Sequence, residues 1–145
     1  MKISVQPEDF DLGLEVLEIQ QDNRIGAVAS FVGQVRDVPM TLEHYAGMTE
    51  REIAKIAQEA AERWSVIDVT VIHRFGELQP ADQIVLVVVA AGHRGEAFAA
   101  CEFIMDYLKT RAPFWKKEQR AGSAEWVEAK SSDDAAAERW SAKRE

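Results

Sequence analysis

The run Ile84–Ala91 (IVLVVVAA) is the feature that most constrains how this chain can fold. A strand-length run without polar positions has to be buried on both faces, whereas a surface strand alternates apolar and polar residues. Other elements must therefore cover both sides of the sheet that contains it. The chain has 145 residues, of which 47% are hydrophobic, so we expect a single domain over residues 1–145 with a core large enough to enclose this strand.

Helix and strand patterns alternate along the rest of the chain. Runs of β-branched and apolar residues between turn residues predict further strands at 2–5, 26–36, 40–45, 66–74, 114–118 and 125–129. Apolar residues at helical spacing predict helices that start near Pro7 and at Gly95, and two more at 50–64 and 132–140, followed by a polar tail at 140–145. These elements predict an α+β fold with flanking helices and a mixed, mostly antiparallel sheet.

Local signals refine these elements. Thr49 followed by Glu52 has the form of a capping box and predicts the start of the helix at 50–64. Gly33 inside a strand predicts a β-bulge or a close approach of backbone, and Pro113 ends the third helix. The residues predicted to be buried are Phe10, Leu14 and Leu17 on the first helix, and Ala97, Phe98, Cys101, Ile104, Met105 and Leu108 on the third.

Composition excludes several classes of function. The net charge of -8 and the pI near 4.9 argue against a nucleic-acid binder. No apolar run reaches the length of a membrane span, and the N-terminus lacks a signal-peptide pattern. Cys101 is the only cysteine, so neither an internal disulfide nor a cysteine-pair metal motif can form, and at a buried position it acts as a small hydrophobe. We expect a cytoplasmic protein without a metal or cofactor.

Three histidines are the first candidates for a site. His93 and Arg94 lie between a strand and a helix, where unpaired amides and two cations suit an anion such as phosphate, although basic residues are common in such loops. His73, which precedes Arg74, is a weaker candidate of the same kind. His44 shares a strand face with Leu42, and we interpret it as structural.

Lys109 and Lys116 flank Pro113, where the chain must turn. If the turn brings both amines into one pocket with Arg36 or Arg94, their mutual repulsion favours proton loss and hence acid–base or nucleophilic chemistry. The alternative is that the lysines only lie along the neighbouring aromatic residues. The residues alone leave both readings open.

Six segments carry a resemblance to a known family. They are FVGQVR (31–36), MTLEHYAGMTE (40–50), VIHRFGEL (71–78), HRGEAF (93–98), FIMDYLKTRAPFWKKE (103–118) and WVEAKSSDDAAAERW (126–140). In this order they resemble the large, catalytic subunit of molybdopterin synthase, over about residues 26–140. The block MDYLKTRAPFWKK is the most distinctive part of the match.

The resemblance implies a sulfurtransferase of molybdenum-cofactor synthesis with an α/β hammerhead-like fold. Such enzymes convert cyclic pyranopterin monophosphate to molybdopterin by installing its two dithiolene sulfurs. The sulfur comes from a thiocarboxylate at the C-terminal Gly-Gly of a small ubiquitin-like carrier subunit, whose tail enters the large subunit. The implied assembly is a heterotetramer built on a homodimer of the large subunit. A lone buried cysteine agrees with an external sulfur donor.

The resemblance also implies roles for individual residues. Lys109 is the expected main catalytic residue, in proton transfer or stabilisation of intermediates, and Lys116 assists it. Substrate binding is expected from Arg36, His93 and Arg94, the last two by reaching across the dimer. Phe31 and Met105 are the expected lining of the channel for the carrier's tail.

One segment departs from the family pattern. Members usually carry a longer, polar, glycine-containing loop after Arg36, and here only Asp37-Val38-Pro39 precedes Met40. Two alternative functions remain open from the sequence: a non-catalytic docking module for a ubiquitin-like partner, and a different phosphate-handling enzyme of the same fold.

Overall fold

The computed structural model describes residues 1–141 apart from 121–122 and 128–130. Within these residues the elements are, in chain order, β1 (Lys2–Gln6), α1 (Leu12–Ile19), β2 (Ala27–Gln34), β3 (Met40–His44), α2 (Met48–Arg63), β4 (Val66–Arg74), β5 (Gly76–Leu78), β6 (Gln83–Ala91), α3 (Arg94–Arg111), β7 (Phe114–Arg120), β8 (Ser123–Val127) and α4 (Ser131–Glu138). The α+β class is confirmed, and so are the predicted strands and helices, with shifts of a few residues at their ends. The short strand β5 was not predicted.

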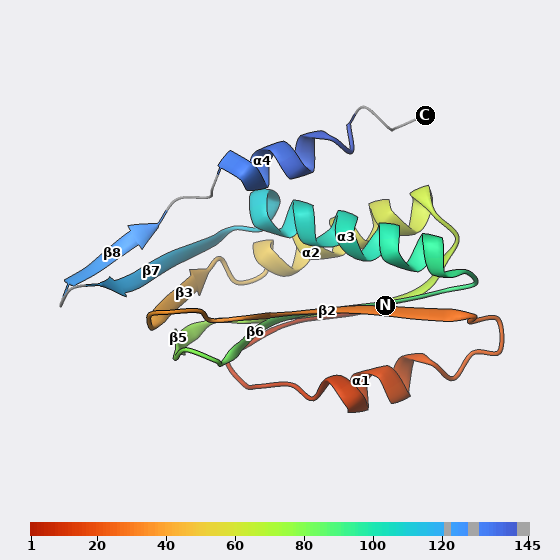
Figure 1. The fold of residues 1–145 in the computed structure, drawn as a ribbon, viewed down its shortest axis with the longest axis horizontal. Coiled ribbons are helices and arrows are strands. Elements are labelled where there is room, and N and C mark those ends of the chain that lie inside the picture. Colours follow the sequence, from red (N-terminus) through yellow and green to blue (C-terminus); the bar gives the residue numbers. More distant parts are fainter. Residues whose placement is uncertain (121–122, 128–130, 142–145) are drawn as a thin grey trace.

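The first sheet has the strand order β1-β4-β6-β2, with β1 parallel to β4 and the other pairs antiparallel. Figure 1 shows α1 on one face of this sheet and α2 and α3 on the other. On β6, Val85, Val87 and Val89 join the core under α2 and α3, while Leu86 and Val88 join the core under α1. The uninterrupted apolar run is therefore explained by burial on both faces.

The second sheet has the order β5-β3-β7-β8 and is entirely antiparallel. The strands thus divide between two sheets, where the sequence led us to expect one. The strands predicted at 114–118 and 125–129 correspond to β7 and β8, which pair with each other, and residues 121–122 between them lie outside the described residues. A small apolar cluster of Val35, Met40, Leu42 and Leu78 supports this sheet.

Gly33 has both properties that the sequence predicted for it. The pairing of β2 with β6 shifts register between Gly33 and Gln34, as at a β-bulge. A Cβ atom at Gly33 would also lie 2.9 Å from a methyl carbon of Val85. The strand therefore bends and passes close to its neighbour just before the link to the second sheet.

The predicted start of α2 was wrong by two residues. The cap is Gly47, whose N–H donates to the Glu50 carboxylate at 2.6 Å, so Glu50 holds the position that we assigned to Glu52. Thr49 is instead fully buried inside the first turn, and its hydroxyl donates to the Tyr45 carbonyl at 2.8 Å. The spacing of Gly47 and Glu50 overlaps that of Thr49 and Glu52, and only the second pair has the residue types of a capping box.

The predictions of burial were also wrong at four residues. On α1, Leu14 and Leu17 face outward, because Asp11 caps the helix later than expected and the buried face carries Ile19. Phe98 on α3 is 65% exposed, although the rest of its predicted stripe is buried. Trp140, at the start of the predicted polar tail, is buried and makes edge-on contact with the Trp64 and Phe103 rings.

Candidate active site

A cavity of about 740 Å³ lies where the end of β2 and the last turns of α3 meet β3 and β7. Its wall is apolar toward the core and charged toward the second sheet. Its lining includes Phe31, Gly33, Arg36, His73, Met105, Lys109, Lys116 and Glu118. Five of the seven residues predicted for the site therefore line one cavity.

Met105 and Lys109 reach the cavity from the same face of α3, since residues four apart lie one above the other on a helix. Met105 is buried and Lys109, one turn later, is exposed. The helix ends at Arg111 because Pro113 disfavours helical geometry at the preceding residue, and Ala112 is extended with φ -73 and ψ 128. This end of the helix directs the chain back along the cavity as β7.

Lys116 enters from β7. Antiparallel pairing sets Leu42 opposite Lys116 and Met40 opposite Glu118, and all four side chains line the cavity. Lys116 Nζ is 3.1 Å from Glu118 Oε1, so the carboxylate holds the amine in place. Lys117 falls on the opposite face of the strand, as expected for a period of two. The predicted turn therefore does bring Lys109 and Lys116 to one pocket.

Phe31 and Arg36 come from β2 and the link that follows it. Phe31 is 42% exposed and lies beside Gly33 at the cavity wall. The Arg36 side chain is 81% exposed, with Nε 3.8 Å from an Asp37 carboxylate oxygen. In the short link between β2 and β3, Asp37 has a left-handed backbone conformation with φ 71. This link forms part of the rim of the cavity. Arg36 is thus a cation at the mouth of the cavity.

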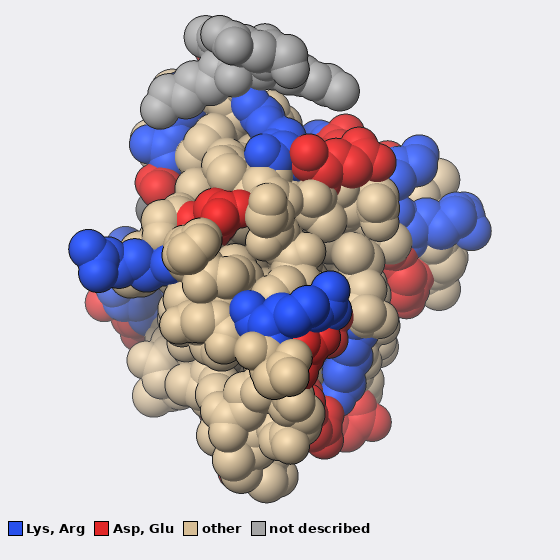
Figure 2. Space-filling model, turned by 90° about the vertical axis from the view of Figure 1, so that its right-hand side faces the viewer, with Lys and Arg blue, Asp and Glu red and all other residues tan. Residues whose placement is uncertain are grey.

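His93 and Arg94 are not brought to this cavity within one chain. They lie at the start of α3, whereas Lys109 lies fifteen residues further along a helix that rises about 1.5 Å per residue. Figure 2 views the molecule from the end at which α3 begins, and basic side chains there are interspersed with acidic ones. A role for His93 and Arg94 in the cavity of the same chain is therefore excluded by distance.

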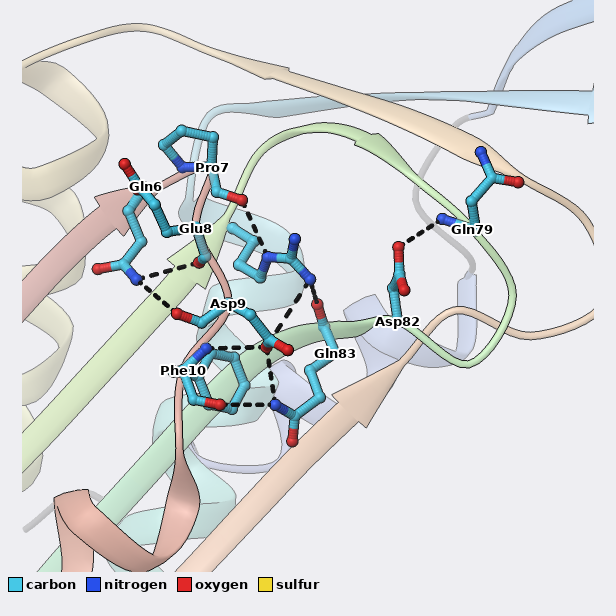
Figure 3. Close-up of polar contacts among 9 residues, drawn as sticks. Gln6, Pro7, Glu8, Asp9, Phe10, Gln79, Asp82 and Gln83 are labelled. Atoms are coloured by element: carbon cyan, nitrogen blue, oxygen red, sulfur yellow. Dashed lines mark hydrogen bonds and ion pairs between the residues drawn. The ribbon is translucent and has the colours of Figure 1, made fainter.

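His73 and Arg74, the weaker candidate pair, have separate roles. The Arg74 guanidinium donates to the carbonyls of Pro7 at 3.1 Å and Gln83 at 2.9 Å and lies 3.8 Å from Asp9. Figure 3 shows these three partners close together. These contacts tie the segment after β1 to β6, and Arg74 does not line the cavity. His73 instead lines the cavity and stacks on Phe114 at 3.8 Å between ring centroids.

The environment of His73 keeps its ring neutral. Burial lowers the pKa of His73 to about 4 against the opposing effect of the bond to the Arg74 carbonyl, and the charges of Lys109 and His44 add to the lowering. His44 has the structural role predicted for it, with Nδ1 3.3 Å from the Thr49 hydroxyl oxygen and its ring against Phe75. Burial raises the pKa of the Cys101 thiol to about 11, which makes it a poor nucleophile.

Among the cavity residues that sequence reasoning did not assign to the site are Glu118, Asp133 and His73. Glu118 could have been found, because it is two residues from Lys116 on the same strand and shares its face. Asp133 comes from α4, which packs against α3. No local sequence pattern predicts this packing. Among the described residues, no cluster of His, Cys, Asp or Glu could hold a metal ion. The search of these residues for a helix able to cross a membrane also found none.

Fold and cavity together define a class: an α+β protein with a cation-lined pocket between a helix end and a sheet, suited to a small anionic ligand. Residues 5–111 match the model of the family described as "MoaE protein". The chain belongs to this family.

Individual relatives agree. The chain is 59% identical to the molybdopterin synthase catalytic subunit of Ralstonia nicotianae over 146 residues, covering 95% of this chain and 83% of the relative. It is 53% identical to the protein of the same name from Cereibacter sphaeroides, covering 97% of this chain and all of the relative. The solved structure of the molybdopterin biosynthesis MoaE protein from Burkholderia ambifaria superposes with a TM-score of 0.86, at 57% identity and 97% coverage of both chains.

Proposed function

We propose that this chain is the catalytic subunit of a molybdopterin synthase. It transfers sulfur from the C-terminal thiocarboxylate of a small ubiquitin-like carrier to cyclic pyranopterin monophosphate, which forms the dithiolene of molybdopterin. The observation that carries the proposal is the convergence of Lys109, Lys116 and Arg36 on one cavity in a chain of net charge -8, within a family whose members bear this name. We place the enzyme, with its reduced Cys101, in the cytoplasm.

The cations account for catalysis by positioning and charge stabilisation. Arg36 at the rim suits the phosphate of an entering substrate. Lys109 stabilises the negative charge that develops when the carrier's sulfur is delivered, and it moves protons to and from the substrate. Lys116, held by Glu118 at 3.1 Å, supports the same charge from the opposite wall. A volume of about 740 Å³ accommodates a pterin together with the end of a peptide tail.

The carrier's tail enters past Phe31 and Met105 in this proposal. Both line the cavity, and Gly33 beside them has no side chain to obstruct an approaching backbone. A Gly-Gly terminus needs such a narrow passage, because its own backbone has to pass close to the wall. The remaining exposure of Phe31 leaves an apolar surface for the tail to cover.

His93 and Arg94 join the site from a second copy of the chain. β2 is an edge strand of the first sheet, and its sequence AVASFVGQ has none of the charges or prolines that usually protect such an edge. Antiparallel pairing of two β2 strands about a twofold axis sets the start of one beside the end of the other. Because Gly26 N–H bonds Ala91 O at 2.9 Å, the loop that follows Ala91 accompanies the start of β2 and would reach the other copy's cavity.

Reconstitution tests the function. Purified protein is mixed with cyclic pyranopterin monophosphate and thiocarboxylated carrier, and formation of the dithiolene product is followed for the wild type and Lys109→Ala. We expect product from the wild type and none from the variant, with an unchanged melting temperature because Lys109 is exposed. A wild type that binds the carrier but makes no product would favour the docking-module alternative. Near-normal turnover by Lys109→Ala would remove this lysine from the mechanism.

Mixing two inactive variants tests the contribution in trans. Lys109→Ala and Arg94→Ala are each inactive as homodimers in this proposal. After subunit exchange about half of the dimers are mixed, and each mixed dimer holds one site with both residues intact, so about a quarter of wild-type activity returns. If Arg94 acts within its own chain, both sites of every mixed dimer remain defective and no activity returns.

A further inference from the structure

His73 is the cavity residue whose chemistry the proposed roles leave unused. Its ring is partly buried, lines the cavity and stacks on Phe114 at an interplanar angle of 20°. The strand β4 ends one residue later, at Arg74, whose side chain is fixed by Pro7, Gln83 and Asp9. The backbone that carries His73 is therefore held firmly from outside the cavity.

One hydrogen bond settles which ring nitrogen carries the proton. His73 Nδ1 lies 2.8 Å from the carbonyl oxygen of Arg74. A carbonyl oxygen only accepts, so Nδ1 must donate, and a neutral ring then has its lone pair on Nε2. Within the described part of the chain Nε2 makes no hydrogen bond, although the ring borders a cavity large enough for a ligand.

The groups around His73 make it an acceptor and not a cation. Lys109 on α3 and His44 on β3 both disfavour a positive ring, as does its burial, while Lys116 and Glu118 on β7 and Arg36 at the rim occupy other parts of the cavity wall. Every other nitrogen group named in the cavity is a donor. The carboxylates on the wall are also acceptors, but Glu118 is engaged by Lys116 and Asp133 comes from α4, whereas His73 Nε2 is a neutral acceptor beside the Phe114 ring. An N–H donor of a substrate that lies against this ring needs such an acceptor, since a donor buried without a partner costs about 1–3 kcal/mol.

We propose that His73 is a substrate-binding residue, and that its Nε2 accepts a hydrogen bond from an N–H donor of the pterin ring. This inference rests on the proposed function for the identity of the ligand. Lys109, Lys116 and Arg36 then recognise the charge of the substrate, while His73 recognises its heterocycle and fixes how the ring lies against Phe114. The phosphate and the pterin ring therefore bind to different walls of the cavity.

Two substitutions separate the two nitrogens. In His73→Asn the side-chain amide can still donate to the Arg74 carbonyl, but nothing replaces Nε2. In His73→Gln the longer side chain returns an acceptor to the position of Nε2. Both lose the stacking on Phe114, so the difference between them reports the acceptor. His44→Asn is the matched control, because His44 lies on β3 of the second sheet, also has its ring near Phe114, and does not line the cavity.

Binding of cyclic pyranopterin monophosphate is measured by calorimetry without the carrier, and KM and kcat are measured with it. We expect Kd and KM to rise about 5- to 100-fold in His73→Asn, with kcat much less affected, and to return to within about threefold of wild type in His73→Gln. The ratio of variant to wild-type Kd should stay constant between pH 6 and 8, because the wild-type ring is neutral throughout.

Three results would overturn the inference. One is a Kd for His73→Asn within about twofold of wild type, and another is a His73→Gln variant as impaired as His73→Asn. The third is a ratio that grows as the pH falls, since that would mean a protonated ring that binds the phosphate. The proposed function can fail separately: a wild type that makes no product but shows the expected pattern of pterin binding leaves the role of His73 intact.

Discussion

The two sheets of this protein differ in how deeply they are buried and in whether they carry charged side chains. Every residue of β6 from Leu86 to Ala91 in the first sheet is fully buried, between α1 on one face and α2 and α3 on the other. Among the residues whose burial the structure describes, the second sheet is supported by an apolar cluster of four buried residues, and it turns Lys116 and Glu118 toward a cavity. Its outward face exposes an edge-on pair of rings, Tyr45 and Trp115. Stability is therefore concentrated in the first sheet, and charge that would be costly in a core is carried by the second.

The largest expected effect on stability is at Gly26, where the first sheet leaves no room. A Cβ atom there would lie 2.2 Å from the carbonyl oxygen of Gly92. Because this oxygen belongs to the backbone, it cannot move aside as a flexible side chain could. We expect Gly26→Ala to lower the free energy of unfolding by roughly 2–4 kcal/mol, measured by urea denaturation. Gly95→Ala is the matched control, because a Cβ atom in that first turn of α3 meets nothing within 4 Å.

The control should be neutral or slightly stabilising, by up to about 1 kcal/mol, because alanine favours helix. Equal stability of the two variants would show that the backbone near Gly26 and Gly92 can move apart at little cost in free energy. The contrast between a rigid first sheet and a functional second sheet would then lose its basis.

The second sheet should show the opposite pattern, a loss of activity without a loss of stability. Lys116→Ala removes a cavity amine, and Lys117→Ala removes its neighbour on the other face of β7. We expect turnover in the reconstituted reaction to fall about 10- to 100-fold for the first and less than about twofold for the second. Both should change the free energy of unfolding by less than about 1 kcal/mol. Similar turnover for the two variants would contradict the role of the cavity-facing side.

The sequence predicted the first sheet better than the second, for a physical reason. A strand buried on both faces, such as Ile84–Ala91, can be predicted from the sequence because every position is apolar. The strand β4 was likewise predicted with its observed bounds. The three-residue β5 can be recognised only from its pairing with β3, which lies far from it in the chain. The division into two sheets depends on such pairings, so local patterns could not reveal it.

For the site, short-range geometry was predictable and long-range geometry was not. The turn at Pro113 was enough to bring Lys109 and Lys116 together, and the structure agrees. Whether His93 or His73 reaches the same cavity depends on the length of α3 and on where β4 ends against β7. The residues around each histidine look alike, a strand followed by arginine, although one lines the cavity and the other lies at the far end of a helix.

The smallest expected effect links the two sheets through His73, which extends from β4 of the first sheet to the ring of Phe114 in the second. Its pKa is lowered to about 4 in the folded protein, against 6.5 for an ordinary histidine. The unfolded chain therefore binds the proton first as the pH falls. The stability that His73 contributes is complete above pH 6.5 and is lost progressively toward pH 4.

At pH 5 this loss should amount to about 1–2 kcal/mol, after allowance for the part of the ring that is open to the cavity. Urea denaturation of wild type and His73→Gln at a series of pH values isolates it, because every other titrating group is shared. The wild type should lose more stability than the variant between pH 6.5 and 5, with a constant difference above pH 7. Parallel curves would mean that the ring is as well solvated in the folded protein as in the unfolded chain. In that case the cavity wall at the end of β4 would be hydrated, and the close packing of the first sheet would stop before His73.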